Sequence, residues 1–180
     1  MIFRETSLAS AYLVVPERHE DDRGYFARTF CIEEFGVRSL PTVVQQCNVS
    51  FNRAAGTVRG MHFQRAPMAE AKLVRCTRGA IFDVMVDIRP ESPTFCQWYG
   101  AELTGDNGHA LFIPEGFAHG FQTLTDGSEV FYQMFTPYSP GHGDGVRWDD
   151  PAFGIHWPLP VSSLAERDRT FPLLRERRLG

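Results

Sequence analysis

The sequence predicts an all-β domain of the sandwich or barrel type. Many short apolar runs follow one another along the 180 residues, and glycine, proline, aspartate or asparagine separates them. This spacing is typical of antiparallel β proteins. Aromatic residues make up 13% of the chain, including 15 phenylalanines, which suits a β-rich core. Helix signals are weak, so we expect only a few short helices.

The strand-like runs can be followed in order along the chain. Within Ala80–Ile88 side chains alternate, so that Val84 and Val86 share one face while Asp83 and Met85 share the other. A carboxylate in the middle of such a strand needs a partner or water. Short helices are expected at Cys31–Phe35 and in the charged tail Ser162–Leu174, which suits an exposed position. The expected strands are Tyr12–Val15, Tyr25–Phe30, Val43–Val49, Thr57–Phe63, Lys72–Cys76, Ala80–Ile88, Trp98–Leu103, Ala110–Ile113, Gly120–Leu124, Val130–Phe135 and Val146–Trp148.

The composition is that of one folded domain, which we expect to span residues 1–180. Hydrophobic residues make up 43% and charged residues 22% of the chain, and this length supports a real core. The net charge of −4 is spread without a basic block, so we expect no nucleic-acid partner. No apolar run reaches the ~20 residues of a membrane span, and we see no signal peptide. Four cysteines without a CxxC pair indicate reduced thiols in a cytoplasmic protein.

Two of the expected strands carry polar faces. Gln46, Asn48 and Ser50 share one face of their strand because residues two apart point the same way. His62 and Gln64 share a face in the same manner. Such faces meet either solvent or a wet cavity, and the first run alone does not decide between the two.

Two motifs resemble those of the cupins. The run Gly56–His62 resembles the first cupin motif, and the Pro-x-Gly turn and histidine of Pro114–His119 resemble the second. A cupin metal site usually has another histidine two residues after the first, where this chain has Gln64, a poor ligand. Glu70 lies nearby, but the ammonium of Lys72 would be unfavourable beside a divalent cation. We therefore expect no metal and no other cofactor.

Three side chains supply the groups that proton abstraction beside a carbonyl requires. His62 can act as the base, Lys72 can stabilise the enolate oxygen, and Tyr132 can return a proton from the other side. Arg59 is suited to hold an anion. Epimerisation requires two such opposed groups and no redox cofactor. Taken singly, each residue also fits a structural histidine, a solvated lysine or a core tyrosine.

Four stretches carry a resemblance to a known family. They read QCNVSFNRAAGTVRGMHFQ, AKLVRCTRGAIFDVMVDIRPESPTF, LFIPEGFAHGFQTL and GVRWDDPAFGIHWP. In this order they resemble the dTDP-4-dehydrorhamnose 3,5-epimerases and related deoxysugar 3-epimerases, from Asp22–Phe26 to Glu166–Asp168. The resemblance implies a cupin-type β jelly roll that acts as a homodimer without metal. It also implies inversion at C3 and C5, or at C3 alone, of a dTDP-4-keto-6-deoxyhexose in deoxysugar biosynthesis of the dTDP-rhamnose type.

The resemblance also implies roles for individual residues. His62 is then the base, and Asp168 is the carboxylate that fixes its tautomer. Lys72 lies near the C4 carbonyl, and Tyr132 is the opposing proton donor. Tyr138 stacks on the thymine ring. The other substrate-binding positions are Arg23, Phe26, Gln46, Asn48, Arg59, His119 and Arg167, of which Arg23 and Phe26 reach across the dimer in the family.

Two departures from the family pattern leave details open. Arg28 stands where the family often has an acidic residue, and the loop Gly141–Asp144 lacks a glutamate that often follows the Tyr-x-Pro step. Both positions lie toward the nucleotide in relatives, so the identity of the base, the sugar and the pathway product stays open. Whether the enzyme inverts C3 alone or both C3 and C5 also stays open. The alternatives of other classes are a metal-dependent cupin, such as a dioxygenase or sugar isomerase, and a non-catalytic sugar-binding cupin.

Overall fold

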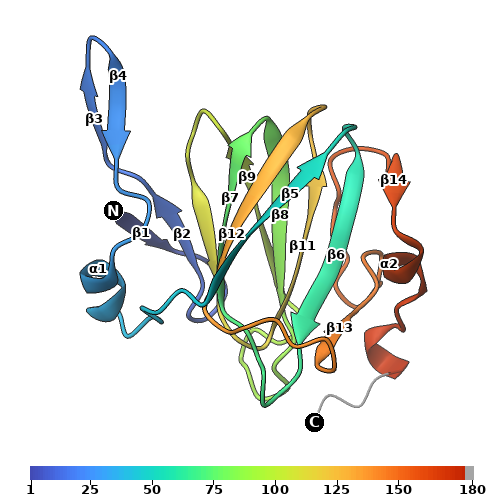
Figure 1. Cartoon of the computed structure of the whole chain (residues 1–180). Helices are drawn as coiled ribbons and strands as arrows, with labels where there is room; N and C mark the ends of the chain where they lie inside the picture. Colours follow the sequence, from blue (N-terminus) through green and yellow to red (C-terminus); the bar gives the residue numbers. More distant parts are fainter. Residues whose placement is uncertain (177–180) are drawn as a thin grey trace.

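The computed structural model describes residues 1–176, and two β-sheets form its body (Figure 1). The first sheet has the strand order β1-β2-β10-β7-β12-β5, and the second has the order β13-β6-β11-β8-β9, with β14 parallel to β6. This arrangement confirms the predicted all-β jelly roll with a few short helices. The strands are β1 (Ile2–Glu5), β2 (Tyr12–Val15), β3 (Arg18–Asp21), β4 (Gly24–Ala27), β5 (Gln46–Asn52), β6 (Thr57–Gln64), β7 (Lys72–Arg78), β8 (Ala80–Asp87), β9 (Trp98–Thr104), β10 (Ala110–Ile113), β11 (Phe117–Thr123), β12 (Ser128–Met134), β13 (Gly143–Gly145) and β14 (Ser163–Leu164). The helices are α1 (Ile32–Gly36), α2 (Glu166–Thr170) and the 3₁₀ turn η1 (Leu174–Glu176).

Three apolar clusters make up the core, one between the sheets and two on their outer faces, and strand β8 shows how the sequence builds the first two. Ile81 and Met85 point into the cluster between the two sheets, where they are fully buried. Val84 and Val86 point to the other side, into a cluster covered by the C-terminal segment. Both faces of β8 are therefore buried, as its alternating apolar residues predict. Helix α1 covers a third cluster on the first sheet through Phe35.

The last part of the chain differs from the sequence prediction. The expected strand Val146–Trp148 is wrong, because the strand next to β6 is β13 at Gly143–Gly145. Val146 still exchanges two backbone hydrogen bonds with Met61, but the pairing ends there. The tail is not one exposed helix either. It contributes β14, α2 and η1, and it buries Asp168 against the sheet.

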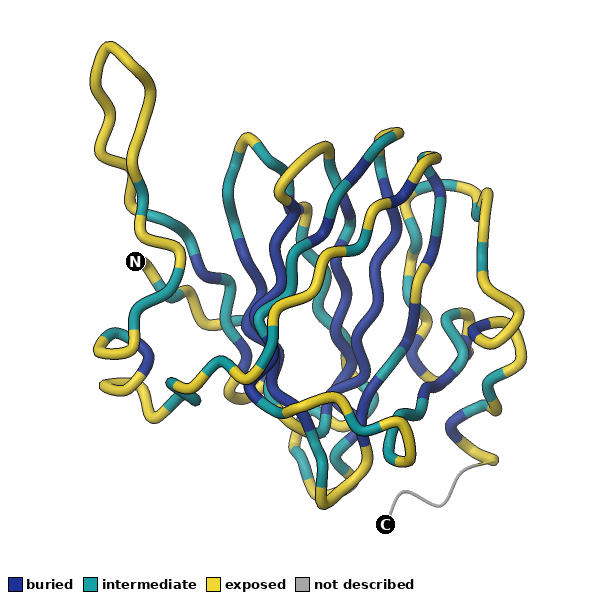
Figure 2. Tube along the Cα trace, viewed as in Figure 1, coloured by how far each residue is buried: buried dark blue, intermediate teal, exposed yellow. Residues whose placement is uncertain are grey.

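The hairpin formed by β3 and β4 projects from the body of the molecule (Figures 1 and 2). Its strands are exposed along almost their whole length. Phe26 exposes 75% and Tyr25 51% of its surface. An isolated two-stranded ribbon is marginally stable in water, so this hairpin is a place where another surface is expected to pack. Within residues 1–176, no helix has the length and apolar character needed to cross a membrane.

Candidate functional site

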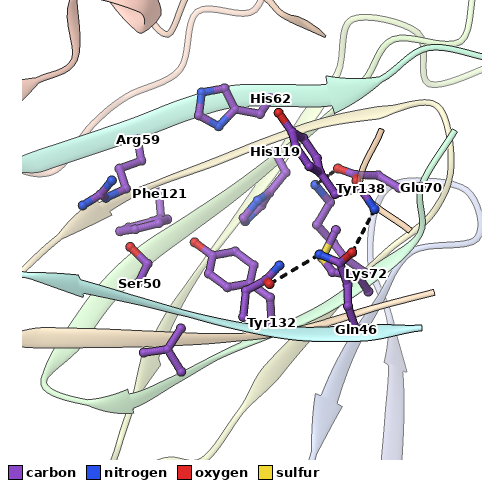
Figure 3. A pocket seen from close by; sticks show the side chains of 13 residues that line it. Gln46, Ser50, Arg59, His62, Glu70, Lys72, His119, Phe121, Tyr132 and Tyr138 are labelled. Atoms are coloured by element: carbon purple, nitrogen blue, oxygen red, sulfur yellow. Dashed lines mark hydrogen bonds and ion pairs between the residues drawn. The ribbon is translucent and has the colours of Figure 1, made fainter. Parts of the chain in front are cut away.

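A pocket of about 450 Å³ opens between the two sheets (Figure 3). Strand β5 contributes the polar face predicted from the sequence, Gln46, Asn48 and Ser50. The polar face of β5 therefore lines a cavity and is not an outer solvated face. The remaining lining residues are Val49, Arg59, His62, Glu70, Lys72, His119, Phe121, Tyr132, Met134 and Tyr138.

His62 and Asp168 form a hydrogen-bonded pair in one wall of the pocket. His62 Nε2 lies 2.7 Å from Asp168 Oδ1, and the Gly60 N–H donates to Asp168 Oδ2 at 3.1 Å. Burial opposes ionisation of Asp168, but these hydrogen bonds and the positive charge of His62 outweigh it and lower the pKa of the carboxyl group. An ionised Asp168 fixes the proton of a neutral imidazole on Nε2 and leaves Nδ1 as the basic nitrogen. A side chain on Gly60 would collide with Gly120, since its Cβ would lie 2.5 Å from the Gly120 Cα.

Lys72 is buried in the pocket wall and is paired. It is the only lysine of the sequence, its surface is 4% exposed, and its Nζ lies 2.5 Å from Glu70 Oε1. The interpretation of Lys72 as a solvated strand-start lysine is therefore wrong. Burial of an ammonium requires such a partner, and Glu70 supplies it from two residues away. The pair presents a fixed donor to the pocket.

Tyr132 lies in the opposite wall, beside a second histidine–aspartate pair. His119 Nε2 lies 2.8 Å from Asp83 Oδ1, and both side chains are buried. The partner that a mid-strand Asp83 requires is thus His119 on the adjacent strand β11. Burial, together with the negative charge of Asp83, raises the pKa of Tyr132, although the Arg59 cation acts against this. Tyr132 therefore keeps its phenolic proton at neutral pH.

The two ends of the pocket carry an exposed ring and a fixed cation (Figure 3). Tyr138 follows β12 and exposes 57% of its surface, and its backbone N–H donates to Gln46 Oε1 at 2.8 Å. Arg59 donates from Nε to Asn52 Oδ1 at 2.7 Å, which holds the guanidinium at the pocket wall. An aromatic face and a guanidinium in one pocket suit a ligand that joins a base to phosphates.

The structure does not bring all predicted site residues into this pocket. Arg23 and Phe26 lie on the projecting hairpin, where Arg23 pairs with Asp21. Arg167 lines a neighbouring cavity of about 370 Å³ together with His62 and Asp168. Arg28 pairs with Glu34 at 3.0 Å and also lies outside the pocket. Of the two departures from the family pattern, only the loop Gly141–Asp144 approaches the pocket mouth, since a Cβ on its Gly143 would lie 3.7 Å from the Tyr138 ring.

The donor set does not resemble a cupin metal centre. Gln64 occupies the position of the second histidine, and its amide is engaged in hydrogen bonds to nearby backbone groups. Across residues 1–176 no three side chains of histidine, cysteine, aspartate or glutamate gather closely enough to hold a metal ion. Independence from metal stays a prediction.

Sequence reasoning missed three partners of the site. Glu70 was weighed as a metal ligand but serves as the counter-ion of Lys72. Asn52 was not singled out, and Gln64 was considered only as the residue that replaces a metal ligand, whereas Asn52 bonds Arg59 and Gln64 bonds the loop at Met68. The alternation contained the signal for both residues. Asn52 continues the polar face of β5 after Ser50, and Gln64 continues the polar face of β6 after His62.

Comparison with known proteins gives a consistent result. The family model described as dTDP-4-dehydrorhamnose 3,5-epimerase matches residues 5–176. A dTDP-4-dehydrorhamnose 3,5-epimerase of Sinorhizobium fredii is 46% identical, over 98% of this chain and 91% of the relative. The crystal structure of the Bacillus anthracis enzyme of that name with TDP and PPi bound superposes with a TM-score of 0.92 at 41% identity, covering 96% of this chain and 98% of that one. A 3'-monoepimerase from Streptomyces bikiniensis in complex with dTDP-quinovose has a TM-score of 0.88 at 32% identity, covering 94% and 86%.

Proposed function

The chain belongs to the dTDP-4-dehydrorhamnose 3,5-epimerase family, and we propose that its pocket inverts C3 and C5 of a dTDP-4-keto-6-deoxyhexose through an enolate. It is a sugar-nucleotide epimerase, so the metal-dependent and the purely sugar-binding cupins no longer compete as alternatives. The finer proposals are which carbons invert, which residues act, and how two chains share a site.

One observation carries the proposed mechanism: His62 and Tyr132 lie in opposite walls of one pocket. His62 belongs to β6 of the second sheet and Tyr132 to β12 of the first. A proton removed from one face of a sugar carbon by His62 Nδ1 can therefore be replaced from the other face by the Tyr132 hydroxyl, which inverts that carbon. Asp168 stabilises the imidazolium that forms. Because burial raises the pKa of Tyr132, its hydroxyl is protonated at neutral pH and has a proton to give.

The enolate intermediate requires a positive group at the C4 oxygen. Lys72 is held by Glu70 and lines the same pocket from β7, the strand beside the β12 strand of Tyr132. A preorganised, buried donor of this kind stabilises developing negative charge without reorganisation. We assign the carbonyl-facing role to Lys72, with His119 as a second contact on the sugar.

The nucleotide then extends toward the mouth of the pocket. The exposed ring of Tyr138 is placed to stack on thymine, and Gln46 and Asn48 line the same side. Arg59 is assigned to the diphosphate, and Arg167, in the neighbouring cavity, reaches the same end of the site. The B. anthracis structure with TDP and PPi bound supports this nucleotide assignment.

The proposed enzyme is a homodimer in which the hairpin of one chain completes the pocket of the other. Phe26 and Arg23 lie far from the reacting groups of their own chain in the projecting hairpin, and both are exposed. Strand β5, at the edge of the first sheet, exposes Val49 and Phe51 by 60% and 51%. An exposed apolar edge strand is normally covered by another element, and a second copy supplies one.

The reaction is tested by proton NMR of dTDP-4-keto-6-deoxyglucose incubated with the enzyme in deuterium oxide. Loss of the H3 and H5 signals together with an inverted product supports C3 and C5 epimerisation, and loss of H3 alone assigns the C3 reaction. His62→Ala should slow exchange by about 10²–10⁴-fold while dTDP still binds. His156→Ala, a change at an exposed histidine outside the pocket, is the matched control. Wild-type exchange in His62→Ala would show that another residue is the base.

Complementation tests the shared site. Arg23→Ala and His62→Ala chains should each be nearly inactive alone, because every site then lacks one of the two residues. A mixed dimer has one site with both residues, so mixing should restore up to about half the activity per dimer if chains exchange freely. Unchanged inactivity, with subunit exchange shown by mass spectrometry, contradicts the cross-subunit site.

The remaining proposals concern the chain as a whole. We propose that residues 1–180, of which 177–180 lie outside the described structure, act as one domain without a cofactor. We also propose a cytoplasmic location, which is supported by Cys31, Cys47, Cys76 and Cys96 all being free thiols.

A further inference from the structure

Gln64, at the end of β6, connects two loops beside the pocket. Its side chain is 5% exposed, and its amide group both donates hydrogen bonds to the two loops and accepts one from them. Nε2 donates to the Met68 carbonyl at 2.9 Å and to the Pro137 carbonyl at 3.2 Å. Oε1 accepts the Ser139 N–H at 2.7 Å.

Both loops carry residues that we have placed in the site. The first loop, residues 65–71, contains Met68 and leads to Glu70 and Lys72. The second, residues 135–142, carries Tyr138, and Gln64 bonds the residues on either side of it. The Tyr138 N–H donates to Gln46 Oε1, and the same loop is also held by Thr136 Oγ1, which donates to the Ala69 carbonyl. The ring of Tyr138 is exposed, so its position depends on its backbone.

We propose that Gln64 is a positioning residue that fixes Tyr138 for stacking on the nucleotide base. The proposal rests on the proposed function. Gln64 stands where a metal-binding cupin has a histidine, and here it connects two loops. Through this connection Gln64 supports substrate binding.

Only a primary amide of this length meets the three demands at once. Two backbone carbonyls require two N–H donors, and one backbone N–H requires an acceptor. A glutamate keeps the acceptor but turns a negative charge toward both carbonyls. A leucine of similar volume leaves all three backbone groups unsatisfied, and each unsatisfied buried group is costly.

The test compares Gln64→Glu and Gln64→Leu with Gln97→Glu, which makes the same chemical change at an exposed glutamine outside the pocket. KM for the dTDP-sugar should rise about 10- to 100-fold in both Gln64 variants, since each lost hydrogen bond changes binding by up to about tenfold. The turnover number kcat should stay within about threefold, because Lys72 is held by its ion pair with Glu70 and by the pairing of β7 with β12, independently of Gln64. Gln97→Glu should match the wild type.

Calorimetry separates positioning from a general structural defect. The wild type should bind dTDP more tightly than inorganic pyrophosphate, and Gln64→Glu should weaken dTDP about 10- to 100-fold but pyrophosphate by less than about threefold. Equal weakening of both ligands, or a fall in kcat at unchanged KM, overturns the proposal. Wild-type protein that does not bind dTDP would overturn the proposed function as well, which is a distinct result.

A double-mutant cycle of Gln64 and Tyr138 tests whether Gln64 acts through Tyr138, also when one of the single Gln64 variants folds poorly. Tyr138→Ala should weaken dTDP binding by itself. Adding Gln64→Glu to Tyr138→Ala should then change dTDP affinity by less than about threefold, because the residue being positioned is already gone. Full additivity of the two changes would show that Gln64 acts independently of Tyr138, and would overturn the assignment.

Discussion

Replacing Asp168 by asparagine tests how the pocket holds its base. The two carboxylate oxygens serve two donors: Oδ1 faces His62 Nε2 at 2.7 Å, and Oδ2 accepts the Gly60 N–H at 3.1 Å. An amide has only one oxygen to offer. The Gly60 N–H is a fixed backbone donor, so we expect the oxygen of the asparagine to remain there and its NH₂ group to face the imidazole.

This orientation gives the variant two separate costs. A neutral amide no longer stabilises the imidazolium, which removes a charge-assisted hydrogen bond of about 1.5–3 kcal/mol. The NH₂ group also requires Nε2 to accept, so the ring proton moves to Nδ1 and the basic nitrogen is blocked. Together these costs amount to about 3–4 kcal/mol, or roughly 10²–10³-fold in kcat.

The assay is the rate of deuterium incorporation at C3 and C5, with KM measured in the same series. KM should change little, because Asp168 is 3% exposed and lies behind His62 from the substrate side. Asp149→Asn, which breaks the more exposed pair with Arg147, is the matched control and should keep wild-type rates. If Asp168→Asn kept more than a tenth of the wild-type kcat, then the carboxylate would not be what orients His62.

Three further predictions concern the acid, the metal and stability. Tyr132→Phe should let solvent exchange at C3 continue while formation of the inverted product falls by about 10²-fold or more. Proton NMR measures both rates, and an equal fall in exchange and in product formation would refute this role of Tyr132. Full activity is expected in excess EDTA because Gln64 replaces a ligand, whereas a stoichiometric metal whose removal abolishes activity would contradict it. Burial opposes ionisation of Asp87, but hydrogen bonds from Arg89, Ser92 and Thr94 lower its pKa to about 2. This contribution to stability is fully present above the unfolded pKa of about 4 and is lost as pH falls toward 2. Asp87→Asn should therefore reduce the free energy of unfolding by about 2 kcal/mol at pH 7 but by about 1 kcal/mol at pH 3, and urea titrations that show an equal loss at both pH values would count against it.

Local patterns were sufficient for much of the fold. The alternation in Ala80–Ile88 placed Ile81 and Met85 on one face and Val84 and Val86 on the other, and both faces are buried as separate clusters. Alternation works because side chains of a strand point to opposite sides regardless of what the strand pairs with. The same rule placed the polar face of β5 correctly, although it did not say that a pocket lay in front of it.

The end of the chain shows where local patterns fail. Val146 is apolar and fully buried, and its neighbours suggested a strand at Val146–Trp148. The strand lies instead at Gly143–Gly145, because there the chain runs beside β6 and can pair with it. Strand boundaries depend on the partner strand, which is distant in sequence.

For the site, the sequence determined the chemistry of the groups, and the tertiary structure decided their environment. The motifs named His62, Lys72 and Tyr132 as base, cation and acid, and residue types alone limit which proton transfers are possible. Only the folded chain places Asp168, from the far end of the sequence, against His62, and only burial makes Lys72 depend on Glu70. The physical reason is that hydrogen-bond partners and desolvation arise from contacts between distant segments, and no local periodicity records these contacts.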